Sequence, residues 1–171
     1  MSFAASSASR RTSGEGPHGR WQVRPAEAKD ATQVAGAVAQ LLNELGGTPP
    51  PAPSMERSAL ALIGDHRAGT VLVADAGGEL VGVLAASWQT AIHVPGRYGL
   101  IQDLWVQSVW RSAAIGAALV EAFAGIARDE RVARIEVGLP KPSFDAIAAT
   151  EAFYVRNGFD VHGTRMRMVL G

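Results

Sequence analysis

The first pattern along the chain is a short strand followed by an amphipathic helix. Residues 21–24 predict the strand, and polar residues 27–30 then open the helix. Gly46 and Gly47 end it. A helix is predicted because its apolar residues recur three and four positions apart: Val34, Val38, Leu41, Leu42 and Leu45.

The next segment predicts a stiff connection and a second helix. Residues 48–53 include four prolines, which exclude both a helix and sheet pairing. Residues 55–63 predict a short helix, closed by Gly64. This proline-rich segment therefore separates two helices.

The middle of the chain predicts three strands. Residues 70–75 and 80–88 are apolar, β-branched runs on either side of the turn sequence Ala-Gly-Gly-Glu at 76–79, which is typical of a β-hairpin. After a loop at 90–96, residues 98–106 are almost continuously apolar. Such a run predicts a strand buried on both faces.

The last third predicts alternating helices and strands. A helix over residues 111–128 joins the central strand to another at 133–139, so the two strands should lie parallel as a βαβ unit. Ser143 is a candidate N-cap for a helix that reaches Asn157 and stops at Gly158. Two closing strands are expected over residues 159–162 and 165–170.

Together these elements predict an α/β fold, α+β in some schemes, with one mixed sheet and helices on both faces. Their order is β-α-α-β-β-β-α-β-α-β-β. The 171 residues suit a single domain, expected over residues 21–171. Residues 1–20 are rich in Ser, Ala, Gly and Arg without an apolar segment, so we expect a flexible tail and no signal peptide.

Composition narrows the possible functions. The formal net charge is zero, so no nucleic-acid or membrane-surface partner is expected. The chain has no cysteine, which excludes disulfides, thiolate catalysis and cysteine zinc sites. The four histidines show no metal-ligand spacing, so no metal is expected. No apolar run is long enough to span a bilayer, and a cytoplasmic location is the expectation.

The junction between the central strand and the next helix is the most informative feature. After Val106, the helix begins with the small residues of Arg-Ser-Ala-Ala-Ile-Gly-Ala at 111–117. The first N–H groups of a helix have no intrahelical partner and lie at the positive end of its dipole. Small side chains leave these groups uncovered, which favours a phosphorylated ligand.

This junction resembles the pyrophosphate motif Arg/Gln-x-x-Gly-x-Gly/Ala of the GNAT superfamily of acyl-CoA-dependent N-acyltransferases. The sequence Ala-Phe-Tyr-Val-Arg-Asn-Gly-Phe at 152–159 is similar to that family's Phe-Tyr-x-x-x-Gly-Phe signature. The order of elements agrees as well. The resemblance covers residues 21–171 and implies acetyl-CoA, or a related short acyl-CoA, as co-substrate without a metal.

The resemblance also assigns cofactor-binding residues. The end of the central strand would line the pantetheine arm, and the helix start would hold the pyrophosphate: Leu104, Trp105, Val106, Arg111, Ser112, Ala113, Ala114, Ile115, Gly116 and Ala117. Ala114 stands where the family has a glycine. Its methyl group is acceptable with helical dihedral angles but would clash if the backbone needed a positive φ.

Tyr154 is the candidate acid that protonates the leaving thiolate. The alternative is that Tyr154 is a structural residue of the core whose hydroxyl bonds to the backbone. Asp103 is the candidate base; a buried structural hydrogen-bond acceptor is the alternative. Strand alternation should point Gln102 to the opposite face. Glu136, on the neighbouring strand, is a weaker candidate base, with an ion pair the more expected role.

The implied reaction is direct attack of a primary amine, from a small molecule or a peptide, on the thioester in a ternary complex. An N–H near Trp105 or Val106 would stabilise the oxyanion. The alternative is a catalytically weak or inactive GNAT-fold domain that binds acyl-CoA or a protein partner. Ala114, Gln102 and Ile147, where several relatives have asparagine, favour that alternative. Family members are frequently dimeric, so a homodimer is possible.

Overall fold

A single mixed sheet organises the chain. The computed structural model describes residues 12–163 and 168. Its six-stranded sheet follows chain order: β1 (Ser13–Gly16), β2 (Gly19–Pro25), β3 (Gly69–Ala76), β4 (Glu79–Thr90), β5 (Arg97–Val106) and β6 (Ile135–Val137). Neighbouring strands are antiparallel except β5 and β6, which are parallel as the βαβ prediction required.

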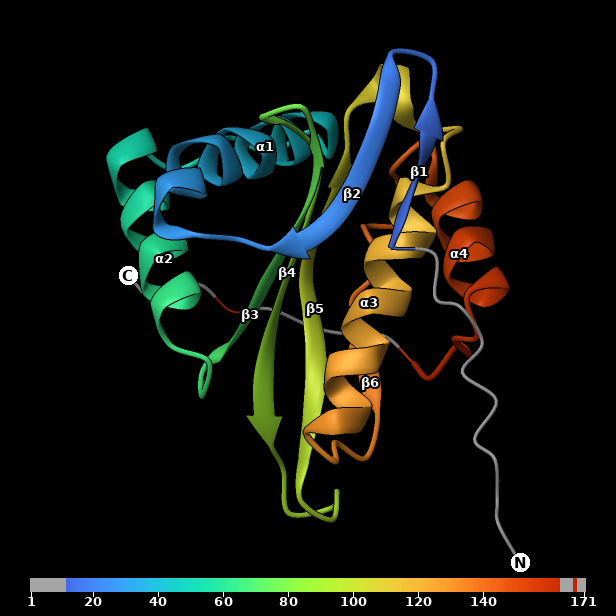
Figure 1. Cartoon of the computed structure of the whole chain (residues 1–171). Helices are drawn as coiled ribbons and strands as arrows, with labels where there is room; N and C mark the ends of the chain where they lie inside the picture. Colours follow the sequence, from blue (N-terminus) through green and yellow to red (C-terminus); the bar gives the residue numbers. More distant parts are fainter. Residues whose placement is uncertain (1–11, 164–167, 169–171) are drawn as a thin grey trace, which may run out of the picture.

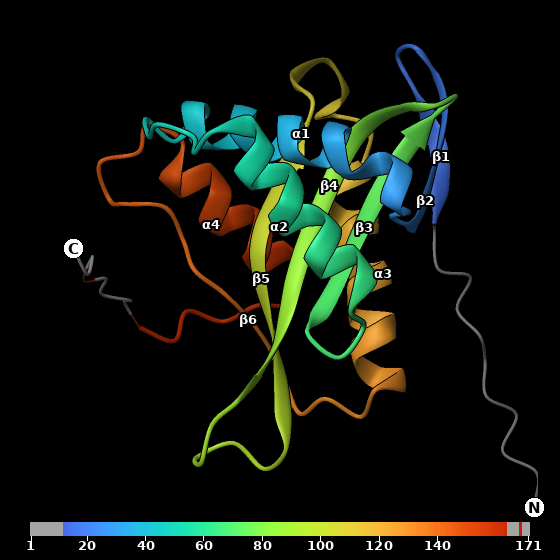
Figure 2. The ribbon, with the colours of Figure 1, turned by 90° about the vertical axis from the view of Figure 1, so that its left-hand side faces the viewer.

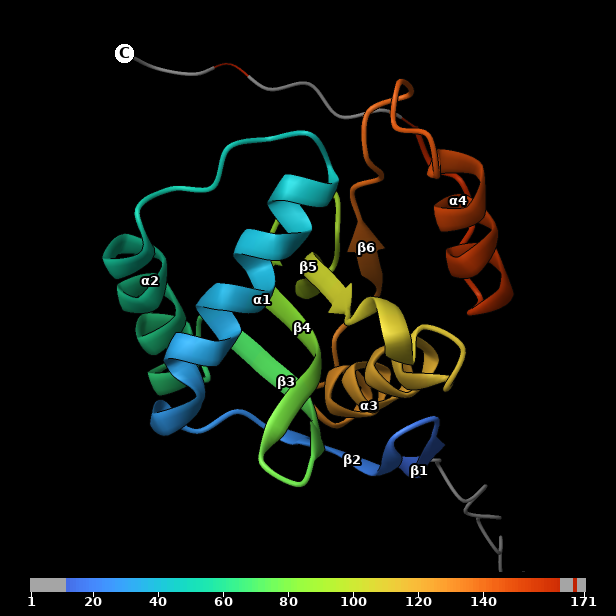
Figure 3. The ribbon, with the colours of Figure 1, turned by 90° about the horizontal axis from the view of Figure 1, so that it is seen from above.

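Helices cover both faces of the sheet (Figures 1–3). α1 (Ala31–Glu44) and α2 (Ala52–Gly64) lie on one face, and α3 (Ile115–Asp129) and α4 (Ile147–Arg156) lie on the other. Short 3-10 turns at Ala28–Asp30 and Ser108–Trp110 precede α1 and α3. Among the described residues, no helix has the length and apolar character that crossing a bilayer demands. The predicted fold class is confirmed.

Strand alternation divides the apolar side chains into two cores. On β3, Leu72 and Ala74 pack with the α3 side, whereas Val71 and Val73 pack with the α1 side. Phe123 of α3 is fully buried at the centre of the first core. Burial on both faces explains why β3, β4 and β5 have nearly continuous apolar sequences.

The sheet begins earlier in the chain than predicted. β1 lies within the segment expected to be a tail, and it pairs with β2 from Ser13 opposite Gln22 to Gly16 opposite Gly19. A side chain at residue 16 would overlap the Trp110 ring, so the hairpin packs directly on the turn before α3. The tail prediction remains for residues 1–11, which lie outside the described residues.

The C-terminal elements are shorter than predicted. β6 covers three residues rather than the predicted 133–139, and residues 159–162 form no strand. α4 begins at Ile147 with Ala146 at its N-cap, so Ser143 is not the cap. The predicted strand at 165–170 lies outside the described residues except for Met168.

Two other helix starts differ from the prediction. α2 begins at Ala52 rather than at residue 55, because proline is well tolerated in a first helical turn and Pro53 occupies it. α3 begins at Ile115 rather than at residue 111, because the preceding residues form a 3-10 turn and then a left-handed residue. The second difference reshapes the predicted phosphate site.

Candidate active site

Strands β5 and β6 separate after a short paired segment. Their last pair is Ile101 with Val137, and β5 then continues to Val106 with no partner on that side among the described residues. The N–H of Gln107 donates to the carbonyl of Val81 in β4, 3.0 Å away. Because successive N–H groups of a strand alternate in direction, those of Leu104 and Val106 face the gap, and that of Trp105 faces β4.

The turn before α3 carries a group of unpaired amides. Among the described residues, no hydrogen bond is found for the N–H groups of Ser112, Ala114, Ile115, Gly116 and Ala117. Ala114 has φ 58° and ψ 12°, the left-handed conformation. Of the two sequence-based alternatives, the positive φ is therefore the one found, and it costs an alanine roughly 1 kcal/mol. Successive unpaired amides around such a residue can bind an anion.

The Arg111 side chain has two partners within the protein. Its Nε donates to the carbonyl of Val106 at 3.0 Å, and Nη2 forms an ion pair with Glu44 at the end of α1. About half of the side chain is exposed, at 51%. Arg111 thus links the end of β5 to α1, and its role in cofactor binding stays a prediction.

The two sequence motifs meet at Gly116. A Cβ at this position would lie 3.2 Å from Cζ of Phe153 and 3.8 Å from Cγ2 of Val106. Gly116 has an ordinary helical φ, so its role is close packing against α4 rather than backbone freedom. The sequence signal for this contact was present, because a helical glycine normally destabilises a helix and needs a packing reason.

Tyr154 lies in the core on the α3 side of the sheet. It is 8% exposed and belongs to the apolar cluster that also contains Ile101 and Val137, the last residue pair before the two strands separate. Phe153 and Phe159 contact its ring edge-on, with centroids 5.1 and 5.3 Å away. No hydrogen bond to its hydroxyl is found within residues 12–163. Burial raises the pKa of Tyr154 to about 12, so the hydroxyl stays protonated at neutral pH.

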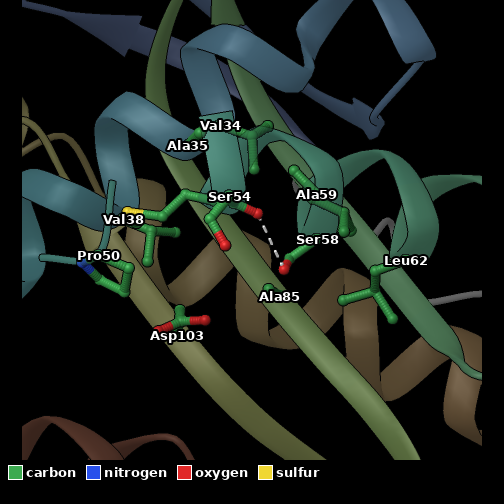
Figure 4. A pocket seen from close by; sticks show the side chains of 12 residues that line it. Val34, Ala35, Val38, Pro50, Ser54, Ser58, Ala59, Leu62, Ala85 and Asp103 are labelled. Carbon is green, nitrogen blue, oxygen red and sulfur yellow. Dashed lines mark hydrogen bonds between the residues drawn. The ribbon is translucent and has the colours of Figure 1, made fainter. Parts of the chain in front are cut away.

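Asp103 lies on the opposite face and lines a cavity of about 180 Å³ beneath α1 and α2 (Figure 4). No donor to its carboxylate is found among the described residues. Burial raises the pKa of Asp103 above its ordinary value of 3.8. The gap between the strands therefore has a carboxylate on one face of the sheet and a protonated phenol on the other.

The orientation predicted for Gln102 is wrong. The pairing of β4 with β5 passes from Ala86 opposite Ile101 to Ala85 opposite Asp103, which leaves Gln102 as the extra residue of a β-bulge. Its amide Nε2 donates to Oγ of Ser87, 2.9 Å away, on the face that carries Asp103. The bulge interrupts the alternation that the sequence argument assumed.

Glu136, the weaker candidate base, has another partner. Glu136 forms an ion pair with Arg134 at 2.7 Å, the role that was more expected. His93, in the loop before β5, contacts Nη2 of the same arginine at 3.3 Å. Ile147 opens α4 and brings no polar group to the gap.

Sequence reasoning missed a buried ion cluster. Arg24 contacts both carboxylate oxygens of Asp30, at 2.6 and 3.1 Å, and its Nη2 contacts Asp75 at 2.8 Å. Asp30 is 3% exposed, and its pKa is lowered chiefly by the hydrogen bond from Arg24. The pKa of Asp75 is lowered first by the N–H of Gly78 and then by Arg24. This cluster joins β2, the turn before α1 and the β3–β4 hairpin.

Comparisons with known proteins agree with this architecture. The model of the acetyltransferase (GNAT) family matches residues 37–159. The chain therefore belongs to the GNAT acetyltransferase family, as its motifs predicted. A comparison with curated proteins found no match.

Solved structures share the fold at low sequence identity. A possible acetyltransferase from Clostridium difficile 630 is similar with a TM-score of 0.73, 19% identity, and coverage of 88% of this chain and 97% of that one. An integron cassette protein from the mobile metagenome of Cole Harbour Salt Marsh has a TM-score of 0.70, 24% identity, and coverage of 87% and 88%. A predicted acetyltransferase from Clostridium acetobutylicum, solved with acetyl-CoA, has a TM-score of 0.72, 15% identity, and coverage of 87% and 96%.

Proposed function

We propose that the protein transfers an acetyl or other short acyl group from acyl-CoA to a primary amine. The observation that carries this proposal is the gap between β5 and β6, with Asp103 on one face and Tyr154 on the other. A thioester in the gap would meet the amine from the cavity side and an acid from the core side. Family membership supports the same reaction class.

The backbone around the gap fits an acyl-CoA. The unpaired amides of Ser112 and of residues 114–117 would hold the pyrophosphate, because the dipole of α3 adds to their attraction for an anion. The exposed side of β5 from Leu104 to Val106 would accept hydrogen bonds from the pantetheine arm and donate to it. The Val106 N–H, or that of Leu104, would stabilise the oxyanion.

In this reaction Asp103 acts as the base and Tyr154 as the acid. The carboxylate of Asp103 takes one proton from the ammonium group, which leaves a neutral amine to attack the thioester carbonyl. When the resulting tetrahedral intermediate collapses, the C–S bond breaks and the hydroxyl of Tyr154 protonates the departing thiolate. The nitrogen gives up its second proton, which restores the Tyr154 hydroxyl, and Asp103 releases its proton to solvent. Direct attack of the amine forms no covalent acyl-protein intermediate, and the chain has no cysteine that could carry one.

A thiol-release assay with acetyl-CoA and a panel of amines tests the proposal. We expect Tyr154→Phe to lower turnover roughly 100-fold while the affinity for acetyl-CoA stays nearly unchanged. Tyr98→Phe is the matched control, because Tyr98 is the only other tyrosine and its ring contacts Arg134 instead of the core cluster. Failure of acetyl-CoA to bind below millimolar concentration would refute the proposal.

A binding domain without turnover is the alternative function. The methyl group of Ala114 favours it, because a side chain in the left-handed turn, where the family has a glycine, hinders close approach of a phosphate to the backbone. Under this alternative, acetyl-CoA would bind, no amine would be acetylated, and Tyr154→Phe would leave every measured property unchanged. The same assay with a parallel binding titration therefore distinguishes the two functions.

A further inference from the structure

We propose that the amine acceptor is an apolar monoamine, with one ammonium group and a hydrophobic body of about six heavy atoms. The inference rests on the proposed function, because it assigns the Asp103 cavity to the acceptor. Three features of that cavity carry it: the nature of its walls, the number of its charges, and its boundary at Met55.

The cavity walls are almost entirely hydrocarbon (Figure 4). Apolar side chains line it from both helices and the sheet: Val34, Val38, Ala59, Leu62, Val71 and Ala85. The hydroxyl of Ser58 donates to the carbonyl of Ser54 in its own helix, 3.2 Å away. An acceptor in this cavity would therefore gain affinity mainly by burying its own apolar surface.

Among the described residues that line the cavity, Asp103 is the only charged one. One carboxylate neutralises one ammonium group, so a second ammonium group would be desolvated against hydrocarbon without a partner. Within residues 12–163, no lysine, arginine or histidine lines the cavity to hold a carboxylate or phosphate of the acceptor. These charges favour a monoamine over a polyamine, an amino acid or a sugar phosphate.

The cavity also limits the length of the acceptor. Its volume of about 180 Å³ equals roughly six waters at ~30 Å³ each. A second cavity of about 340 Å³ lies between α1 and residues 49–56, and Ala35, Pro50 and Met55 line both cavities. Glu56 also lines the second cavity, where its carboxylate accepts a hydrogen bond from Thr32, 2.8 Å away. Of these three shared residues, Met55 alone has a long, flexible side chain, so it is the one whose movement would open the acceptor cavity toward the second.

Matched pairs of amines test the charge argument. The thiol-release assay would compare hexylamine with 1,6-diaminohexane, and 2-phenylethylamine with phenylalanine. The members of each pair share a body and differ by one charged group. We expect the monoamine to have a kcat/KM roughly 100-fold higher in each pair. Turnover that favours the diamine or the amino acid would overturn the inference and leave the proposed function intact.

A chain-length series tests the boundary at Met55. We expect wild-type activity to be greatest near hexylamine and to decline toward decylamine, and Met55→Ala to move the maximum to longer amines. Leu60→Ala is the control, because Leu60 lies on the same helix, is 41% exposed and lines neither cavity. An unchanged chain-length profile in Met55→Ala would refute the role of Met55.

A binding measurement separates this inference from the proposed function. Saturation-transfer NMR of the CoA-loaded protein would compare the same amines without requiring turnover. If no amine is acetylated but hexylamine still binds more tightly than 1,6-diaminohexane, the proposed function fails and the ligand class stands. If neither amine binds, or the diamine binds more tightly, the ligand class is wrong.

Discussion

The ring of Phe153 lies directly against the backbone of Gly116. A Cβ on Gly116 would come within 3.2 and 3.3 Å of two ring carbons, closer than ordinary van der Waals contact. This contact joins the start of α3 to α4 and so brings the anion-binding turn and Tyr154 together. The two sequence motifs that indicated the family are thus one packed unit.

Gly116→Ala should therefore destabilise the protein by about 1–2 kcal/mol, because the added methyl group forces the Phe153 ring to move. Gly36→Ala in α1 is the control; nothing lies within 4 Å of its Cβ position, and alanine there should stabilise by up to about 1 kcal/mol. Urea unfolding measures both. Phe153→Leu in the Gly116→Ala background should recover part of the loss, and a gain from Gly116→Ala alone would contradict the packing argument.

Ala114→Gly should stabilise the protein by about 0.5–1 kcal/mol. The glycine removes the cost of a left-handed alanine, which exceeds the extra chain entropy that glycine gives the unfolded state. Ala124→Gly, in the helical part of α3, should instead destabilise by about 1 kcal/mol. Equal losses of stability in both variants would show that residue 114 is not strained in solution.

Several structural features could not be predicted from the sequence. The motif spacing identified residues 111–117 as an anion site, but it could not determine φ at Ala114, which depends on the 3-10 turn at Ser108–Trp110. Strand alternation assigned Gln102 to the wrong face, because a bulge depends on the register of two strands rather than on one sequence. Similarly, β1 was missed because its four residues, Ser-Gly-Glu-Gly, have no strand propensity and pair only through tertiary context.

Asp103→Asn should increase stability at neutral pH while it lowers acetyl transfer. Burial raises the folded-state pKa of Asp103 above its unfolded value, so this carboxyl favours folding at low pH and loses that contribution as pH rises through the folded pKa. Asparagine has no such loss. Urea unfolding at pH 7.5 and pH 4 should show the gain at pH 7.5 and little of it at pH 4. The exposed Asp145→Asn should behave as wild type at both.

Asp30→Asn should cost about 2 kcal/mol at pH 7, because it weakens the buried contacts with Arg24. Both aspartates of this cluster have lowered pKa values, so their contribution is present above pH ~4 and is lost as pH falls below it. Acid titration of the unfolding midpoint should therefore show a steeper loss in wild type than in Asp30→Asn. The exposed Lys29→Gln variant is the control and should not differ measurably from wild type.

The separation of β5 from β6 has a consequence for folding. Most exposed strand edges lie at the rim of a sheet, but the side of β5 beyond Ile101 is an edge in the interior. Under the proposed function, the pantetheine arm of acyl-CoA would pair there like an additional strand. Folding and binding are then one coupled equilibrium, and ligand at 100 times its Kd adds about 2.7 kcal/mol to the free energy of unfolding. The melting temperature of this protein should therefore rise with the concentration of acyl-CoA.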